Sequence, residues 1–136
     1  MKTFPKPYPL AAADRKGQSF YRSARFAWRG VRIAFKRELN LQRQLIIGVL
    51  VIAAGIVLHV TMVQLAILIL TTAAVMLLVM VNSAIEALAD ALMPSYHDKV
   101  RDAKDMAAGA VLVMSFAAVA VGIVILLPPL LDLLVG

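Results

Sequence analysis

Three polar side chains recur at four-residue intervals in the second half of the chain: Asn82, Glu86 and Asp90. In a helix this spacing places all three on one face. A carboxylate at the centre of a lipid bilayer costs about 2.5 kcal/mol or more, so an acid at the end of a long apolar stretch marks a candidate functional site. We expect Glu86 near the membrane interface, where the cost is smaller. A structural acid at a helix end is the alternative interpretation.

A second carboxylate is expected at the same depth. Glu38 is the only acid between Asp14 and Glu86, and it lies where a basic segment gives way to the first apolar stretch. Carboxylate oxygens suit Mg²⁺, which keeps several waters, and the ammonium group of Lys104 beside Asp105 suits a polyphosphate. These residues therefore predict a site for a magnesium-bound polyphosphate at one membrane surface. A solvated Lys104–Asp105 charge pair is the alternative.

The composition of the chain excludes a soluble enzyme. Its 136 residues are 62% hydrophobic, and the mean hydropathy is +0.86. So few polar side chains cannot cover a small globule, and a disordered chain requires low hydrophobicity. The chain has no cysteine and no Gly-x-Ser-x-Gly motif, which excludes disulfides, thiolate sites and the common hydrolase nucleophiles. We therefore expect an all-α integral membrane protein.

Three apolar stretches are long enough to cross a bilayer, which requires about 20 helical residues. The expected spans cover residues about 41–60, 65–88 and 96–127. The link between the first two spans has no Lys or Arg, whereas the N-terminal part and the second link carry all fourteen. The positive-inside rule therefore places the N-terminus in the cytoplasm and, with three spans, the C-terminus outside.

The third span is expected to begin in water and to end at two prolines. Ser95 can cap its helix while Asp98 bonds back in a capping box, so the helix is expected to begin near Tyr96. Pro128 and Pro129 are expected to end it, because proline lacks an amide proton and its ring clashes with the preceding turn.

Small residues are frequent in the third span, at positions 107–110, 117, 118, 120 and 122. Such residues let neighbouring helices approach closely, and three helices alone bury little surface, so a homo-oligomer is expected. The alternative is that Ala and Gly are common in any spanning helix.

The segment from about 19 to 37 is amphipathic and basic. Apolar residues recur at steps of three and four, opposite a basic row formed by Arg22, Arg25, Arg29, Arg32 and Lys36. We expect a surface helix whose aromatic residues enter the acyl boundary while the basic row meets phosphate headgroups. A solvated basic face on a buried helix is the alternative. Residues 1–17 are expected to form a flexible arm before a single membrane domain from residue 18 to 136, and nucleic acid is not an expected partner of a chain mostly in lipid.

Several short motifs resemble the signature of the small prokaryotic diacylglycerol kinase family, which includes undecaprenol kinases. They are Asn82-Ser83-Ala84-Ile85-Glu86, Asp90, Tyr96-His97, Ala103-Lys104-Asp105-Met106, and the run from Trp28-Arg29-Gly30-Val31-Arg32 through Phe35 to Glu38. The resemblance covers roughly residues 19 to 127 in order. It implies a homotrimer in the bacterial inner membrane, with a surface helix and three spans per chain. Such enzymes transfer the γ-phosphoryl group of MgATP to a lipid hydroxyl, at sites shared between neighbouring chains.

The resemblance also implies roles for individual residues. Glu38 and Glu86 would bind Mg²⁺, and Asn82 would help order that site. The nucleotide would be contacted by Tyr96, His97, Lys104 and Asp105, and the lipid substrate would be held by Trp28 and Arg32.

The chain departs from the family pattern at Val79, where the signature has a glutamate proposed as the general base. Positions 79, 82 and 86 share a helix face, and no acid occurs from Thr71 to Val81. A positioned base contributes about 10²- to 10⁴-fold, so reduced turnover is expected. Three interpretations remain open: a lipid kinase in which Asp90, Asp105 or a metal-bound hydroxide accepts the proton, a catalytically impaired protein that binds lipid and nucleotide, and a small membrane scaffold.

Overall fold

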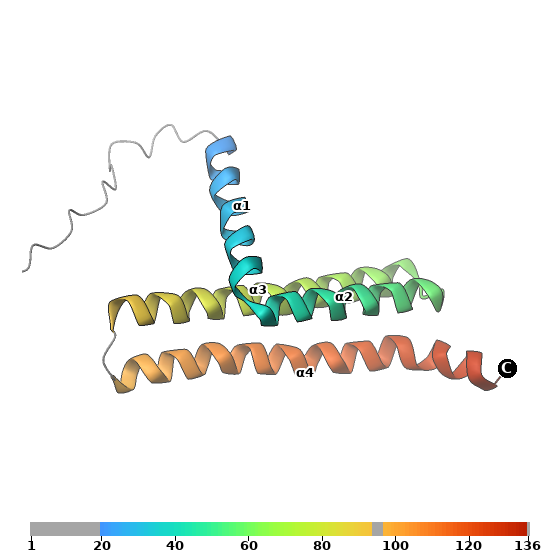
Figure 1. Cartoon of the computed structure of the whole chain (residues 1–136). Coiled ribbons are helices and arrows are strands. Elements are labelled where there is room, and N and C mark those ends of the chain that lie inside the picture. The colour runs from blue at the N-terminus through green and yellow to red at the C-terminus, as the bar shows by residue number, and fades with distance from the viewer. Residues whose placement is uncertain (1–19, 94–96, 136) are drawn as a thin grey trace, which may run out of the picture. The chain divides into compact units, whose positions relative to one another are not determined.

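The structure is a computed structural model that describes residues 20–93 and 97–135. These residues form four helices, α1 (Phe20–Arg37), α2 (Leu39–Val57), α3 (Met62–Leu92) and α4 (Asp98–Val135) (Figure 1). The last three are long and apolar enough to cross a membrane. The prediction of an all-α membrane protein is therefore confirmed. The expected arm at residues 1–17, the capping Ser95 and the expected helix start at Tyr96 lie outside the described residues.

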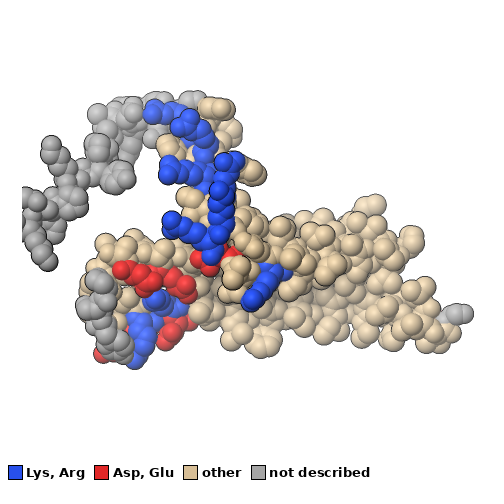
Figure 2. All heavy atoms as spheres, in the orientation of Figure 1, with Lys and Arg blue, Asp and Glu red and all other residues tan. Residues whose placement is uncertain are grey.

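The chain divides into two compact units. The first unit ends at Ile33, within α1, and the second begins at Ala34. The part of α1 in the first unit leaves its aromatic side chains exposed, including Phe20 at 89% and Trp28 at 64%. An apolar face opposite a row of basic residues is typical of an amphipathic helix. Its basic residues follow α1 as a continuous band in Figure 2.

A tight turn joins α2 to α3. The amide of His59 donates to the carbonyl of Ile56 and that of Val60 to the carbonyl of Gly55, both at 3.1 Å. This is the hydrogen-bond pattern of a Schellman motif, and it requires the left-handed conformation that His59 adopts at φ 55°. The next helix begins at once, because the Thr61 side chain and Gln64 form a capping box. The pair α2–α3 is therefore a closely connected helical hairpin.

Two glycines bring α2 close to α3. Gly48 and Gly55 are both buried and face α3 seven residues apart. A Cβ atom at Gly48 would clash with the methyl group of Thr72, and one at Gly55 would lie 3.1 Å from Cδ1 of Leu68. Small residues of this kind let spanning helices pack closely where lipid leaves little hydrophobic drive for association.

The core of the second unit is small. Leu41, Val75 and Val79 form its buried cluster, and parts of α1, α3 and α4 pack against it. α3 contacts both α2 and α4 along its length (Figure 1). Large apolar side chains remain exposed along all three long helices, as expected where lipid or another copy of the chain covers them.

The prediction that Pro128 and Pro129 end the last helix is wrong. Both prolines lie inside α4, which continues to Val135. They remove the amide donors to the carbonyls of Val124 and Ile125. In a spanning segment the helix is nevertheless the better alternative, because irregular backbone exposed to lipid would leave more polar groups unpaired.

Candidate functional site

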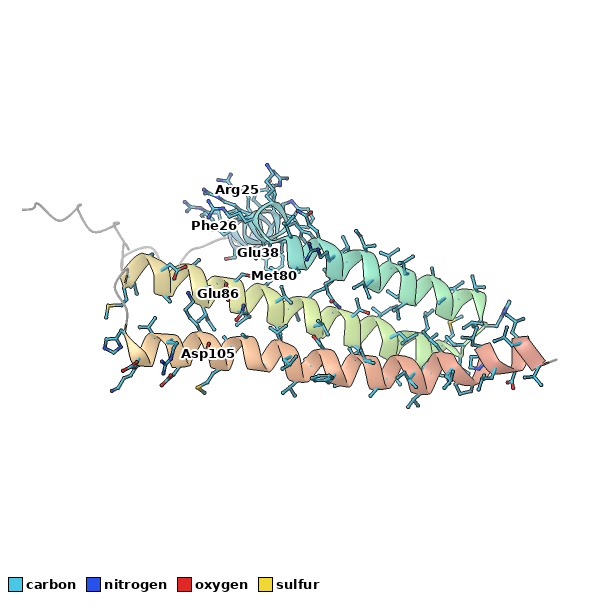
Figure 3. All side chains as sticks on the ribbon, turned by 60° about the horizontal axis from the view of Figure 1, so that its bottom comes forward. Arg25, Phe26, Glu38, Met80, Glu86 and Asp105 are labelled. Carbon is cyan, nitrogen blue, oxygen red and sulfur yellow. The ribbon has the colours of Figure 1, made fainter. Side chains whose placement is uncertain are left out.

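A polar cavity of about 440 Å³ lies where the start of α2 meets α3 and α4. Side chains from three helices and from the residue before α2 form its wall. The lining residues are Glu38, Asn40, Arg43, Gln44, Val75, Val79, Asn82, Ser83, Glu86, Ala108, Val111 and Ser115. Glu38 and Glu86 thus line one cavity although they are far apart in the sequence (Figure 3).

Glu38 occupies the break between α1 and α2. Its extended backbone (φ −104°, ψ 102°) interrupts the helix, and its side chain makes no capping hydrogen bond. The break is held on both sides, because the Glu38 amide donates to the carbonyl of Ala34 at 2.9 Å and the Gln42 side chain donates to the carbonyl of Phe35 at 2.7 Å. The partly buried Glu38 carboxylate is therefore left to face the cavity.

Asn82 and Glu86 interact directly on α3. The Nδ2 atom of Asn82 donates to Oε1 of Glu86 at 2.9 Å. The Oδ1 atom of Asn82 is buried and has no hydrogen-bond partner among the described residues. A buried polar oxygen without a partner is costly, and this atom can accept a hydrogen bond or bind a cation. The amide thus orients one carboxylate and offers an oxygen of its own.

This donor set fits a hard cation. It contains two carboxylates and one amide oxygen, which are the ligand types that Mg²⁺ prefers. No cluster of three or more His, Cys, Asp or Glu side chains suited to a metal occurs in residues 20–93 and 97–135. A cation that keeps waters and binds phosphate oxygens needs only a few protein ligands, whereas zinc normally takes three or four.

Lys104 forms an ion pair beside the cavity. Its Nζ atom lies 2.9 Å from Oδ1 of Asp90 and thereby joins α4 to α3. Lys104 precedes the apolar part of α4, which begins at Met106, and so lies outside the membrane-spanning stretch. The hydrogen bond from Lys104 to Asp90 raises the lysine pKa, with further contributions from the charges of Asp90 and Glu86. Figure 2 shows acidic and basic side chains gathered at this end of the bundle.

Val79 combines two roles in the structure. Its side chain lines the polar cavity and also belongs to the buried cluster with Leu41 and Val75, where it is 9% exposed. The position that the family pattern assigns to a base thus lines the cavity, but it holds an apolar side chain.

The structure brings together only part of the predicted site. Glu38, Val79, Asn82 and Glu86 share the cavity, and Lys104 is held next to it by Asp90.

The other predicted residues lie elsewhere. His97 and Asp105 are exposed and do not line the cavity. Trp28 and Arg32 are exposed on α1, in the first compact unit. Tyr96 lies outside the described residues.

Sequence reasoning missed Asn40, Arg43 and Gln44, which extend the cavity wall along α2. The available signal was the polar run that follows Glu38, in which Arg43 is the only charged residue of α2. Arg43 forms no ion pair with a carboxylate of the described residues. The role of Asp90 as the partner of Lys104 was also missed.

Comparisons with known proteins agree with this arrangement. The chain matches the prokaryotic diacylglycerol kinase family over residues 25–126. A diacylglycerol kinase of Synechocystis sp. is 46% identical over 114 residues, which cover 83% of this chain and 65% of that relative. The match therefore spans just under two thirds of the length of that relative.

Two further relatives are matched over most of their own length, a second diacylglycerol kinase and an undecaprenol kinase. A diacylglycerol kinase of Escherichia coli is 32% identical over 98 residues, which cover 72% of this chain and 80% of the relative. An undecaprenol kinase of Bacillus subtilis is 30% identical over 111 residues, which cover 82% of this chain and 90% of the relative. With the match extending over most of the three spanning helices and the whole polar cavity, the chain belongs to the prokaryotic diacylglycerol kinase family.

Proposed function

We propose that the protein is an ATP-dependent lipid kinase of the bacterial inner membrane, which transfers the γ-phosphoryl group of ATP to the hydroxyl of a membrane lipid. The observation that carries this proposal is the shared cavity of Glu38 and Glu86, with the unpartnered Asn82 oxygen beside them. The relatives are diacylglycerol and undecaprenol kinases, which supports a lipid alcohol as the acceptor.

The cavity residues would hold the phosphates and their metal ion. Glu38 and Glu86 would bind Mg²⁺, which when bound neutralises charge on the transferring phosphate, and Asn82 would orient Glu86. Arg43 lines the same cavity and would pair with phosphate oxygens. The oxygen-rich donor set supports this assignment.

The remaining nucleotide contacts would come from the polar end of the bundle. Lys104 would exchange its bond with Asp90 for a phosphate oxygen, while Tyr96, His97 and Asp105 complete the nucleotide contacts. Because phosphate and carboxylate compete for the same ammonium group, Asp90 becomes available when Lys104 turns to the nucleotide. Trp28 and Arg32 would hold the lipid at the interface.

The wider arrangement follows the family resemblance. A homotrimer with sites shared between neighbouring chains would cover part of the apolar surface that one chain leaves exposed. The charge distribution supports a cytoplasmic N-terminus, which would place the cavity on the side where ATP is available.

Deprotonation of the lipid hydroxyl would be the slow step of the reaction. Val79 cannot accept a proton, so turnover would depend on Asp90 or Asp105 and would be slow. The burial of Val79 in an apolar cluster also favours a second candidate function, a protein that binds lipid and nucleotide with little turnover.

The decisive experiment measures phosphate transfer from ATP to diacylglycerol and to undecaprenol by the wild type, Val79→Glu and Val79→Gln. We expect Val79→Glu to raise the rate about 10²-fold or more on one lipid, because it restores a base that Val79→Gln, of similar size, does not. Equal rates for both folded variants would contradict the proposed role of this position.

Nucleotide binding separates both candidate functions from a scaffold. Glu86→Gln is expected to weaken Mg²⁺-dependent ATP binding strongly, whereas Asp102→Asn, an exposed acid paired with Arg101 on α4, serves as the matched control. A scaffold predicts no such binding by the wild type.

A further inference from the structure

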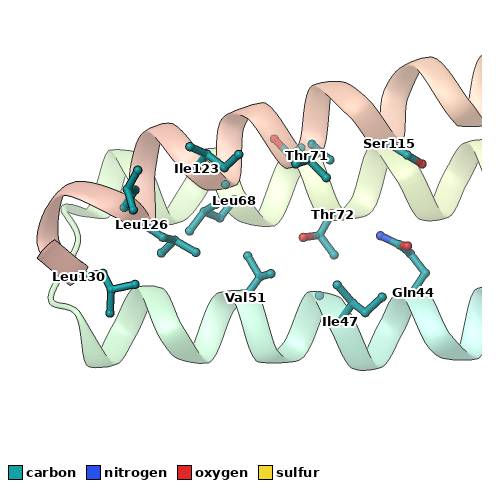
Figure 4. A pocket seen from close by; sticks show the side chains of 15 residues that line it. Gln44, Ile47, Val51, Leu68, Thr71, Thr72, Ser115, Ile123, Leu126 and Leu130 are labelled. Carbon is teal, nitrogen blue, oxygen red and sulfur yellow. The ribbon is translucent and has the colours of Figure 1, made fainter.

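An apolar groove of about 500 Å³ lies between α2, α3 and α4 (Figure 4). It extends from Gln44 and Ser115 towards Leu130 near the end of α4. Gln44 and Ser115 also line the polar cavity, so the two spaces adjoin at these residues. A molecule with a polar head and an apolar tail could therefore occupy both at once.

Polar side chains occur inside this otherwise apolar groove. Two of them are satisfied within their own helices, since the Thr71 hydroxyl donates to the carbonyl of Ile67 at 2.7 Å and the Ser115 hydroxyl to that of Val111 at 2.8 Å. Gln44 and Thr72 differ, because neither side chain makes a hydrogen bond to another described residue. A donor left unpaired next to hydrocarbon is costly.

Packing sets the orientation of the Thr72 side chain, and Gln44 points into the groove. The methyl group of Thr72 lies against Gly48 at the close approach of α2 and α3, which leaves the hydroxyl as its free polar group. Gln44 extends from α2 into the groove, towards the helices that carry Thr72 and Ser115 (Figure 4). Both donors line the groove, and Gln44 lies at the end where the groove adjoins the cavity with the two carboxylates.

We infer that Gln44 and Thr72 are specificity-determining residues that donate hydrogen bonds to the ester carbonyls of an acylglycerol, whose hydroxyl lies in the polar cavity and whose acyl chain follows the groove. This inference rests on the proposed lipid kinase function. In an acylglycerol the ester carbonyls follow the free hydroxyl within a few bonds, and Gln44 lies where the groove adjoins the cavity that the two carboxylates line. A polyprenol has only hydrocarbon at this place and would leave both donors unpaired, and a site built to hydrogen-bond a group discriminates against analogues that lack it.

The test compares three lipids that share a terminal hydroxyl. Purified full-length protein in detergent is titrated with dioleoylglycerol, with its dioleyl diether analogue, which lacks the carbonyls, and with undecaprenol. Bound lipid is measured by native mass spectrometry. We expect the wild type to bind the diester about five- to tenfold more tightly than the diether, as one or two neutral hydrogen bonds allow.

Substitutions of Gln44 and Thr72 test whether these side chains cause the preference for the diester. Gln44→Leu and Thr72→Val are expected to reduce the preference towards equality while leaving diether binding unchanged. The matched control is Thr71→Val, because the Thr71 hydroxyl is already bonded to Ile67 and its loss should leave the preference intact. If Gln44→Leu does not fold, Gln44→Glu replaces the donor by an acceptor at constant size and is expected to reduce the preference for the diester in the same way.

Two results would overturn the inference. One is equal binding of diester and diether by the wild type, or tighter binding of undecaprenol. The other is an equal loss of affinity for all three lipids in Gln44→Leu, which would indicate that Gln44 contacts other helices or subunits rather than the lipid. Phosphate transfer measured on the same samples keeps the two proposals apart, because selective binding without transfer contradicts only the kinase function, and transfer without selectivity contradicts only the role of Gln44 and Thr72.

Discussion

The ammonium group of Lys104 on α4 lies 2.9 Å from the carboxylate of Asp90 on α3, directly beside the cavity that Glu38 and Glu86 line. In this arrangement the Asp90 carboxylate binds the ammonium group that would otherwise be available to a phosphate. Both partners are partly open to solvent, with 35% of the Lys104 side chain and 71% of the Asp90 side chain exposed, so the pair can exchange. The ion pair thus links helix packing at this end of the bundle to the proposed nucleotide binding.

Removal of the lysine charge tests its role in nucleotide binding. Lys104→Gln should weaken MgATP binding about tenfold or more, because a charge-assisted hydrogen bond contributes about 1.5–3 kcal/mol. Titration calorimetry on the purified protein measures the change. Lys99→Gln, an exposed lysine at the start of the same helix, is the control. Equal weakening in both variants would indicate a general charge effect and contradict a specific contact.

Asn82 should affect the metal requirement more than the fold. Asn82→Leu keeps the approximate size but removes both the bond to Glu86 and the unpartnered oxygen. We expect a higher Mg²⁺ concentration for half-maximal ATP binding, by about tenfold, since outer ligands of metal sites contribute about 10- to 100-fold in affinity. An unchanged Mg²⁺ dependence in the folded variant would separate Asn82 from the metal site.

The close approach of α2 and α3 predicts a difference between two glycines. Gly48→Ala should destabilise the protein by about 1–3 kcal/mol, because the added Cβ meets the Thr72 methyl group and overpacking has costs of this size. Gly109→Ala on α4 meets no atom within 4 Å and should be neutral or slightly stabilising. Thermal unfolding in the same detergent compares the two, and equal melting temperatures would contradict the described packing.

A glutamate at position 79 should give a distinctive pH dependence. The carboxyl introduced by Val79→Glu would line the polar cavity beside Leu41 and Val75. A base works only when deprotonated, so the transfer rate of Val79→Glu should rise with increasing pH, whereas the rate of Val79→Gln should not. A rate of Val79→Glu that is flat from about pH 5 to 8 would show that this group does not accept the proton.

The periodicity of α3 was enough to predict that Asn82 and Glu86 lie on one helix face, where the structure has them in contact. The change from basic to apolar sequence at Glu38 was the reason to expect that residue at the same depth. Both inferences depend on local spacing and on the bilayer, which impose depth without any knowledge of how the helices pack.

Packing explains what the sequence could not predict. Arg43 lines the polar cavity, and Gln44 lines both the cavity and the apolar groove, because α2 contacts α3 through Gly48 and Gly55. The direction of that contact is not encoded in the apolar period of α2. The pairing of Lys104 with Asp90 depends on the axial register of α4 against α3. The continuation of α4 beyond its prolines was missed because the rule that proline ends helices comes from water, where freed carbonyls find solvent.

A double-substitution cycle on Glu38 and Glu86 tests whether the two carboxylates hold one ion. Mg²⁺-dependent ATP binding is measured by calorimetry for the wild type, Glu38→Gln, Glu86→Gln and the double variant, each checked for folding by its melting temperature. If both residues bind the same magnesium ion, each single change should reduce the affinity strongly and the double change should add little, since residues that act as a unit are not additive. Two independent, fully additive losses, or no loss in either single variant, would contradict a shared metal site and with it the proposed phosphoryl transfer.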